Sequence, residues 1–471
     1  MRTVAVETSP LAALAAELDE VAARRLEAGA QRARALLRDR VVWNISATDG
    51  GGGVAELLRT LLPYVRDAGV DTRWLVLDGD ADFFALATRL HLVLHGDPGD
   101  GGELGPEEMA HYDRVLAANL AEVRDVVSPG DVVILHDPAT AGLVPGLKSR
   151  GAIVLWRSHI GTDAADGVAD RAWAFLEPSL DRVDRVILTR ATYRPGFLDE
   201  GLVRVIAPSV DPLSPKNRHL DAATVTSLLR SCGALAGGAD AGPTGDTQDA
   251  GDPATGETGG PSSQRAGGPV PADARVVLQV SRWDRLKDMT GVLIAFDEGF
   301  DQVPPDVHLV LAGAEARAED RAGTEVLEQC LQMWHGLEGD VRARVHVVCL
   351  PADDVAHNAL LVNALQRYAT VVVQKSLVEG FGLTVAESLW KGRPVVATAV
   401  GGILDQIEDG TNGLLVPDPR DLEGLMTRVC RLLAEPGFAA QLGATAQARV
   451  RREFLSDRHL LQYVDVLEEL L

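Results

Sequence analysis

Short apolar strands alternate with helical stretches along most of the chain, and this alternation limits the fold more than any other feature. A first series of predicted strands runs from residues 41–45 to 203–206, and a second runs from 276–280 to 413–416. Short apolar strands separated by helices form parallel sheets that helices cover, with binding sites at the carboxyl ends of the strands. The sequence therefore predicts two α/β halves with a cleft between them.

Composition predicts where these halves begin and end. Residues 1–38 are expected to form a helical extension, and residues 39–220 the first α/β domain. Residues 233–271 are rich in Gly, Pro, Ala, Asp and Thr without an apolar period, which predicts a disordered insertion. The second α/β domain is predicted at 272–445. Apolar residues at helical spacing in 446–471 predict a C-terminal helix that packs back on the first domain.

Charge and cysteine content exclude several classes of protein. The 471 residues include 45 basic and 68 acidic side chains, a net charge of -23, which argues against nucleic-acid and anionic-membrane partners. The four cysteines are scattered, so neither a zinc site nor a disulfide framework is predicted. No apolar run reaches the roughly 18 residues of a membrane helix, and the N-terminus turns acidic where a signal peptide stays apolar. We therefore expect a cytoplasmic protein, and a homodimer stays open.

Two glutamates eight residues apart, Glu379 and Glu387, are the strongest functional signal. A β-rich stretch precedes them and an apolar helical stretch, 385–390, follows, so Glu379 is predicted on a glycine-flexed loop and Glu387 in the first turn of a helix. Free N–H groups at a helix start favour anionic or hydroxyl-rich ligands, and two carboxylates there suit the two sugars of a nucleotide sugar. The alternative for Glu387 is a capping box with Thr384, which has a structural role only.

Two cations and a glycine run follow the first strands of the two halves. Arg282 and Lys287 come just after the predicted strand 276–280, where phosphates bind in strand–loop–helix units. The alternative, a solvated pair of basic side chains, is weakened by the glutamate loop in the same predicted domain. The run 51–53 follows strand 41–45 but lacks the lysine of a P-loop, so an ATPase is not indicated.

Motifs in both halves occur in an order that resembles a known family. Those of the second half are Ser281-Arg282 with Lys287, Glu379-Gly380-Phe381-Gly382 with Glu387, Val400-Gly401-Gly402, and Asp409 to Gly413. They resemble the retaining glycosyltransferases of family 4, whose GT-B fold has two facing Rossmann-like domains. The first half resembles the trehalose glycosyltransferring synthases, and fungal-type trehalose phosphorylases are similar to these. Its motifs are Trp43-Asn44, Gly51-Gly52-Gly53-Val54-Ala55-Glu56, His136-Asp137-Pro138, Trp156-Arg157 with His159-Ile160, and Asp211 to Asn217.

The resemblance implies roles for individual residues on the donor side. It places Arg282 and Lys287 on the donor diphosphate, where their charge offsets that of the leaving phosphate. It places Glu379 on the donor sugar, together with the N–H groups of Gly380, Phe381 and Gly382. It places Glu387 on the ribose hydroxyls. The glycine loop that closes over the phosphates consists of Gly51, Gly52 and Gly53.

The acceptor side is less defined. The resemblance suggests that His159, two residues after Arg157, contacts a donor or acceptor hydroxyl, although a lone histidine is more often structural. His136 and Asp137 are weaker candidates, because Asp-Pro after a strand is also ordinary turn chemistry. The family usually carries Asp directly after the His-Ile pair, whereas this chain has Gly161, with Asp163 nearby. The candidate acceptor-binding residues are Arg157, His136, Asp137 and Asp163.

These observations predict a retaining glucosyltransferase that moves glucose from a nucleoside diphosphate glucose to free glucose and forms trehalose. Its partners would be small sugars and the nucleotide sugar. No metal-ligand cluster and no cofactor are predicted, since Arg282 and Lys287 would take the part of a divalent cation. The alternatives are a trehalose phosphorylase, a transferase with another small acceptor, and a nucleotide-sugar-binding protein without turnover.

Overall fold

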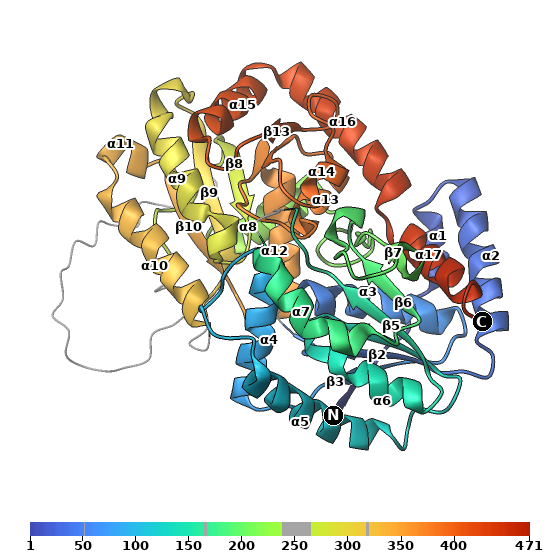
Figure 1. Cartoon of the computed structure of the whole chain (residues 1–471). Helices are drawn as coiled ribbons and strands as arrows, with labels where there is room; N and C mark the ends of the chain where they lie inside the picture. Colours follow the sequence, from blue (N-terminus) through green and yellow to red (C-terminus); the bar gives the residue numbers. More distant parts are fainter. Residues whose placement is uncertain (51, 164–166, 238–264, 317–319) are drawn as a thin grey trace, which may run out of the picture.

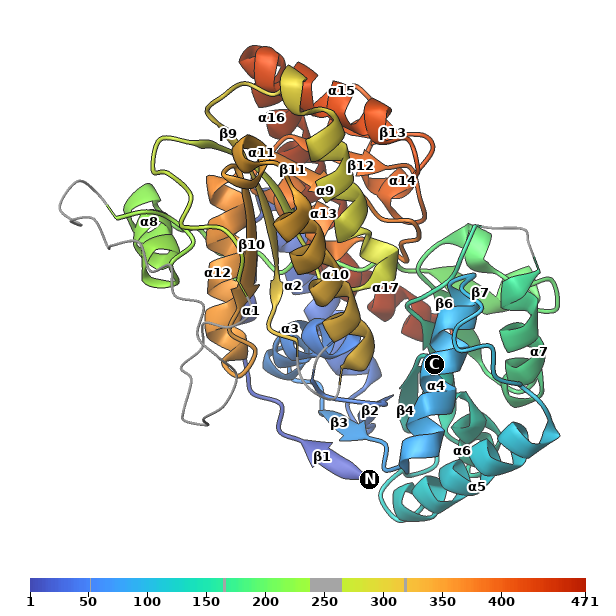
Figure 2. The same ribbon diagram turned by 90° about the vertical axis from the view of Figure 1, so that its left-hand side faces the viewer.

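Two parallel sheets with helices on both faces make up the molecule. The computed structural model describes residues 1–50, 52–163, 167–237, 265–316 and 320–471. In Figure 1 the first domain lies below and to the right of the second, and Figure 2 shows the same two bodies after a quarter turn. No helix in these ranges is long and apolar enough to cross a membrane.

The first sheet has the strand order β1-β3-β2-β4-β5-β6-β7. Its strands are β1 (Arg2–Val4), β2 (Val42–Ser46), β3 (Thr72–Val76), β4 (Val132–His136), β5 (Ile153–Ser158), β6 (Arg185–Leu188) and β7 (Val203–Val205). All neighbours are parallel except β1, which runs antiparallel to β3. Strands β2 and β4 are fully buried, as expected for a sheet covered on both faces.

The helices of the first domain form two layers. One face of the sheet packs on α4 (Ala81–Leu94), α5 (Pro106–Val123), α6 (Val144–Ser149) and α7 (Val168–Leu180). The other face packs on α2 (Glu20–Leu36), α3 (Gly53–Asp67) and α17 (Ser456–Glu468), with α1 (Leu11–Ala16) beyond α2. Short 3-10 turns complete the domain at η1 (Pro138–Leu143), η2 (Ala191–Tyr193) and η3 (Glu200–Leu202).

The second sheet is wholly parallel, in the order β10-β9-β8-β11-β12-β13. Its strands are β8 (Arg275–Val280), β9 (Val307–Ala314), β10 (Val345–Leu350), β11 (Val371–Gln374), β12 (Val395–Thr398) and β13 (Leu414–Val416). One face packs on α8 (Ala222–Ser231), α12 (Val355–Tyr368), α13 (Leu383–Trp390) and α16 (Pro436–Glu453). The other packs on α9 (Met289–Glu298), α10 (Arg321–Gly336) and α15 (Leu422–Ala434). The short elements η4 (Arg285–Lys287), η5 (Phe300–Gln302), α11 (Gly339–Arg342) and α14 (Ile403–Gln406) lie between these.

Each sheet has one point where the strand order reverses. In the first sheet it lies between β2 and β4, and in the second between β8 and β11. Loops that leave the carboxyl ends of such strands diverge to opposite faces and open a crevice, where ligands bind in open α/β sheets. The topology alone therefore selects the loops after these four strands as the place of the site.

Three predicted boundaries need correction. The segment 1–38 is not wholly helical, because Arg2–Val4 forms edge strand β1, in which only Val4 is buried. The boundary at 446 falls inside the continuous helix α16, which packs on α13 and α15, so the chain leaves the second domain after residue 453. Near the crossing, the main chains of Val210 and Phe454 share a 2.8 Å hydrogen bond, so the two inter-domain segments run side by side.

The third correction concerns 233–271. Residues 238–264 lie outside the described residues, but the flanks of this segment are ordered parts of the second domain. Leu235 pairs with Val270, and Ala266 pairs with Val347 on β10. All four side chains are buried. The predicted insertion was therefore too long at both ends. The few buried apolar residues in its flanks, Leu235, Ala266 and Val270, do not stand out in a segment rich in Gly, Pro and Asp.

Candidate active site

The two switch points face each other across the domain boundary. The guanidinium of Arg285 forms an ion pair with Asp97 of the first domain. A Cβ on Gly53 would lie 3.7 Å from Leu383 Cδ1, so the start of α3 stands opposite the start of α13. Of the predicted glycine loop, Gly51 lies outside the described residues, while Gly52 is the N-cap of α3 and Gly53 its first residue.

Glu379 and Lys287 form the centre of the site. The Lys287 Nζ donates to Glu379 Oε2 at 2.6 Å, and the Ser376 hydroxyl donates to the same oxygen at 3.1 Å. The two partners are well shielded, with Glu379 8% exposed and the Lys287 side chain 17% exposed. The loops after β8 and β11 thus bring together two residues that are far apart in sequence, as the switch-point topology requires.

Helix α13 begins beside this pair, and the N–H groups of its first turn receive no side-chain cap. Gly382 is the N-cap and has no side chain to accept from them. Gly380 and Phe381 precede it, so all three predicted backbone donors lie at this helix start. Uncapped N–H groups at a helix N-terminus favour an anion.

Gly401 explains the Val-Gly-Gly motif. A Cβ at this position would lie 1.6 Å from the main-chain oxygen of Glu379, and its φ is 51°. Both observations require glycine. The loop that leads to α14 therefore packs directly against the backbone of the glutamate loop.

The capping-box interpretation of Glu387 is wrong. Glu387 is the fifth residue of α13, in its second turn, because the helix already begins at Leu383. Its carboxylate contacts Gln366 Nε2 at 3.5 Å and Lys216 Nζ at 3.5 Å. The side chain is 4% exposed, and burial raises the pKa of Glu387 while Lys216 opposes that rise.

Lys216 was missed in the sequence, although it lies in a motif of the first half. It leaves the inter-domain segment to pair with Glu56 of α3 at 2.8 Å as well as with Glu387. Burial alone would lower its pKa, but the two carboxylates raise it, so the amine stays charged. Lys216 therefore links the helix after the glycine loop to the predicted ribose carboxylate.

Arg282 and Lys287 differ in their placement. The Arg282 guanidinium is 67% exposed and pairs with Asp284 at 3.2 Å. Lys287 is held inward by Glu379. Both follow β8 as predicted, but in this structure only Lys287 lies at the centre of the site.

A chain of hydrogen bonds fixes the histidines of the first domain. His136 Nε2 lies 3.1 Å from Asn44 Oδ1, His136 Nδ1 lies 3.1 Å from His159 Nε2, and Arg157 Nε donates to His159 Nδ1 at 3.3 Å. The amide oxygen can only accept, so both rings are neutral with the proton on Nε2. Burial and the charge of Arg157 lower the pKa of His136 to about 3 and that of His159 well below its usual range.

Asp137 has a strained backbone at the end of β4. Its φ is 62° with ψ 174°, a region that non-glycine residues rarely occupy and that occurs mainly at functional sites. Its carboxylate accepts from the His159 N–H at 2.8 Å. Burial raises the pKa of Asp137 to about 7, an effect that this hydrogen bond partly offsets. A carboxyl group poised near neutrality can give or take a proton.

The prediction that Arg157 contacts an acceptor is not supported. Its side chain points to α17, where it donates to His459 Nε2 at 2.9 Å and to the Tyr463 hydroxyl at 2.6 Å. It also donates to the Ile206 carbonyl, and the residue is 1% exposed. Strand alternation turns Arg157 to the sheet face that α17 covers, so it ties α17 to the sheet.

Asp163 is engaged by two side chains of the first domain. Its carboxylate pairs with Arg190 and accepts from the Thr192 hydroxyl at 2.6 Å. Arg190 also pairs with Asp405 in the second domain. Asp163 therefore lies at the domain boundary, and its role toward an acceptor stays a prediction.

His95 was also missed. It lies at the end of α4, and a Cβ on Gly380 would lie 3.2 Å from its Cε1 atom. Burial lowers the pKa of His95 to about 4, with Lys287 adding to that effect. Its Nδ1 has no hydrogen-bond partner in the described part of the chain. A histidine inside an amphipathic helix gives no sequence signal that separates it from a packing residue.

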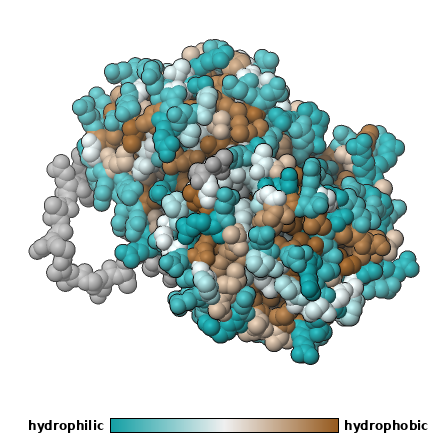
Figure 3. All heavy atoms as spheres, viewed as in Figure 1, coloured by the Kyte–Doolittle hydropathy of each residue, from teal (hydrophilic) through white to brown (hydrophobic). Residues whose placement is uncertain are grey.

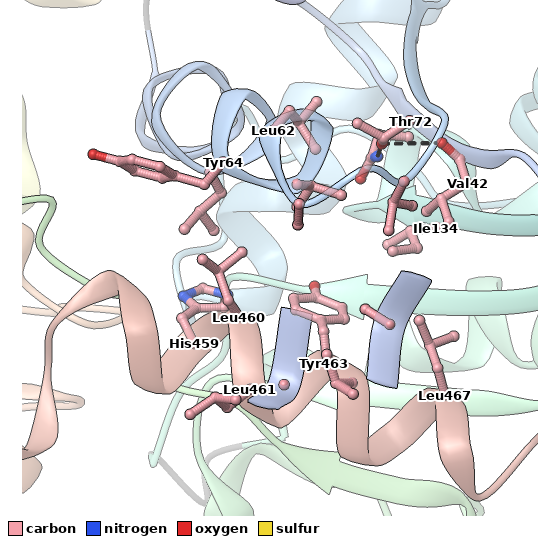
Figure 4. A pocket seen from close by; sticks show the side chains of 18 of the residues that line it. Val42, Leu62, Tyr64, Thr72, Ile134, His459, Leu460, Leu461, Tyr463 and Leu467 are labelled. Carbon is pink, nitrogen blue, oxygen red and sulfur yellow. Dashed lines mark hydrogen bonds between the residues drawn. The ribbon is translucent and has the colours of Figure 1, made fainter. Parts of the chain in front are cut away.

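An apolar cavity of about 100 Å³ lies elsewhere, between α2, α3, α17 and the first sheet. Figure 4 shows Leu62 and Ile134 on one side and Leu460, Tyr463 and Leu467 of α17 on the other. The polar side chains in this lining, such as Asn44, His136 and Arg157, already bond one another or α17, so few groups remain for the hydroxyls of a sugar and the cavity is not the sugar site. On the outer surface in Figure 3, hydrophilic residues cover much of the face and hydrophobic ones gather in smaller patches. In the described residues, no three or more His, Cys, Asp or Glu side chains are grouped to hold a metal ion.

Comparison with known proteins decides the family. The model for the N-terminal domain of trehalose synthase matches residues 44–195, and that for group 1 glycosyl transferases matches 262–449. A trehalose synthase of Pyrococcus horikoshii is 31% identical, over 92% of this chain and 91% of its own length. One of Rubrobacter xylanophilus is 30% identical over 97% of both chains. The chain belongs to the trehalose synthase family.

The family and the fold predicted from the sequence are thereby confirmed. A sucrose-phosphate synthase structure from Thermosynechococcus elongatus superposes with a TM-score of 0.64 at 21% identity, covering 92% of this chain and 99% of that one. It shares the GT-B fold of two facing α/β domains. As a member of the trehalose synthase family, the chain is a glycosyltransferase enzyme of trehalose-related glycosyl transfer.

Proposed function

We propose that this trehalose synthase family member transfers glucose from a nucleoside diphosphate glucose to free glucose, with retention of the α-configuration, and so forms trehalose. The observation that carries the proposal is the Lys287–Glu379 pair at the uncapped start of α13, opposite the start of α3. A cation, a carboxylate and a helix N-terminus together suit a sugar that leaves from a diphosphate.

The donor binds mainly to the second domain in this proposal. The N–H groups at the start of α13 and the amine of Lys287 hold the diphosphate. Glu379 accepts from donor-sugar hydroxyls, and Glu387 accepts from the ribose hydroxyls. Arg282, which is exposed and pairs with Asp284 at 3.2 Å, turns toward the phosphates when the donor binds.

No side chain is required as a covalent nucleophile. The acceptor hydroxyl attacks on the face from which the phosphate departs, and the leaving phosphate oxygen takes the hydroxyl proton. Lys287 offsets the charge that develops on that phosphate. Asp137, with a pKa near neutrality, hydrogen-bonds the acceptor sugar from the first domain. Narrowing of the cleft excludes water and so suppresses donor hydrolysis.

The test is incubation of the purified protein with glucose and each nucleoside diphosphate glucose in turn. NMR of the product should show an α,α-1,1 linkage, and the anomeric proton reports retention directly. Activity should persist after treatment with a metal chelator, since the proposal uses no metal. The absence of trehalose with every donor would refute the proposed reaction.

Two further arms separate the alternatives. Trehalose with inorganic phosphate should yield no glucose phosphate, whereas a trehalose phosphorylase would release it. Calorimetric titration with the nucleoside diphosphate should show binding together with turnover, whereas a binding protein would show binding alone. Replacing glucose by other small sugars or glycerol identifies a different acceptor.

A further inference from the structure

A short segment of the first domain reaches across the boundary and holds the glutamate loop. It is residues 190–193, here called the strap, which follows β6 and contains the 3-10 turn η2. The strap has no place in the predicted site. Its two ends, Arg190 and Tyr193, both contact the second domain.

Tyr193 makes the first contact. Its hydroxyl lies 3.1 Å from the main-chain oxygen of Glu379 and 2.9 Å from that of Gly380, and it donates to both. The residue is 3% exposed. Its ring fills the space above Gly161, where a Cβ would lie 2.3 Å from the ring atoms. A side chain at 161 and the ring at 193 therefore exclude each other.

Arg190 makes the second contact. It donates to both carboxylate oxygens of Asp405, at 2.6 and 3.0 Å, which is the two-pronged geometry that fixes orientation as well as distance. The guanidinium also lies over the Tyr193 ring, 5.7 Å from its centroid. Asp405 belongs to α14, which follows the Gly401 turn that packs on Glu379. Both anchors of the strap thus converge on the same loop pair.

We propose that the strap is a positioning segment that fixes the backbone of residues 379–380, so that the Glu379 carboxylate stays on Lys287 and Ser376 and faces the cleft. Tyr193 orients the loop from one side, and Arg190 holds the turn that supports it from the other. Because Arg190 also pairs with Asp163, the strap joins the predicted acceptor side to the donor side. The consequence for catalysis rests on the proposed function, whereas the positioning itself does not.

Hydrogen exchange tests the positioning without any substrate. Tyr193→Phe removes the hydroxyl but keeps the ring over Gly161, so amides in 376–383 should exchange about five- to tenfold faster than in the wild type. Arg190→Gln, which loses the paired contacts to Asp405, should do the same. The matched control is Tyr368→Phe, whose hydroxyl donates to the Ala272 carbonyl at 3.1 Å and whose loss should leave 376–383 unchanged. Wild-type exchange in both strap variants would overturn the proposal.

Kinetics then tests the consequence. Tyr193→Phe should lower kcat about fivefold and raise the Kd of the nucleoside diphosphate by a smaller factor, because the hydroxyl bonds residues 379 and 380, whereas the diphosphate is also held by Lys287. A purely structural role would instead lower the melting temperature with unchanged kcat, and that result would overturn the proposal. If the wild type forms no trehalose, the proposed function fails, and the exchange experiment still decides whether the strap positions the loop.

Discussion

The two faces of the cleft use their polar side chains differently. On the second domain, Lys287 and Glu379 come from neighbouring loops, and the helix start beside them has no side-chain cap. On the first domain, His136 and His159 are bound in a chain that ends at Arg157, which α17 holds from behind. The same sheet topology therefore gives one face whose charged groups are arranged for a ligand and one whose histidines are held within the fold. Mutations should separate the two: chemistry on the second face, stability behind the first.

Lys287→Ala should give the largest effect. Without the amine, the buried Glu379 loses its partner and the departing phosphate loses its nearest cation. Removal of one such donor costs about 10²–10³-fold in kcat. The initial rate of trehalose formation at saturating donor measures this loss.

Arg282→Ala should lower kcat less, about tenfold, because the guanidinium is exposed.

A matched control for charge removal is Arg321→Ala. Its side chain is 91% exposed and pairs with Glu325 of the same helix, so the rate should stay at the wild-type value. A Lys287→Ala enzyme with wild-type kcat and an intact melting temperature would contradict the assignment of the donor face.

Arg157→Met should act on stability. Methionine fills much of the space but leaves His459, Tyr463 and the Ile206 carbonyl without their donor. Unsatisfied buried groups of this kind should cost about 2–3 kcal/mol of unfolding free energy. Chemical denaturation measures the loss. A stable Arg157→Met protein whose only defect is a raised KM for glucose would show instead that Arg157 serves the acceptor.

The strands and the central residues of the donor face could be predicted from the sequence, whereas contacts between distant segments could not. The apolar runs predicted all the parallel strands of the two sheets, because strands that helices cover on both sides are apolar on both faces. Edge strand β1 was not predicted, because it has three residues and only Val4 is buried. Lys287 and Glu379 were found because each follows a strand directly.

Residues that meet only in three dimensions could not be found this way. Tyr193 and Lys216 contact residues of the second domain, and no local sequence pattern indicates these contacts. The capping box failed because Gly382, in a left-handed conformation, takes the N-cap position and shifts Thr384 into the helix. Arg157 was misassigned because the local sequence does not show that α17, far along the chain, supplies partners for its guanidinium.

Asp137→Asn should change the pH dependence of stability on the first face. The folded pKa of Asp137 is raised to about 7, above its ordinary value, so the folded state binds the extra proton between those two values. Stability from this group is therefore greatest at low pH and falls as pH rises to about 7. Asparagine does not titrate, so the Asp137→Asn protein avoids this loss. Its unfolding free energy should exceed that of the wild type by about 1–2 kcal/mol at pH 8 and differ little from it near pH 4. Melting temperatures at several pH values measure it. If the melting temperatures of the two proteins changed with pH in the same way, the pKa of Asp137 would not be raised in the folded state.

Glu387→Gln should weaken nucleotide binding about tenfold, because the ribose loses a charged acceptor. Thr384→Ala is the matched control in the same helix. It should change neither nucleotide affinity nor stability, since the N-cap is Gly382 and the Thr384 side chain does not cap the helix. Calorimetric titration with the nucleoside diphosphate measures both variants. If Thr384→Ala destabilises the protein as a lost cap would, by about 1 kcal/mol, the corrected helix start is wrong.

The smallest effect is expected from a change on neither face. Residues 238–264 lie outside the described residues, and the insertion predicted there from composition stays a prediction. Replacing them by a Gly/Ser linker that keeps Leu235, Ala266 and Val270 should leave melting temperature and kcat at wild-type values. Removing the flanks as well should destabilise the second domain, because Leu235 pairs with Val270 and Ala266 pairs with β10. The two deletions thus differ only in a few apolar anchors. If the shorter deletion lowered kcat while the melting temperature stayed unchanged, the segment would contribute to turnover. The expectation that its replacement has no effect would then be wrong.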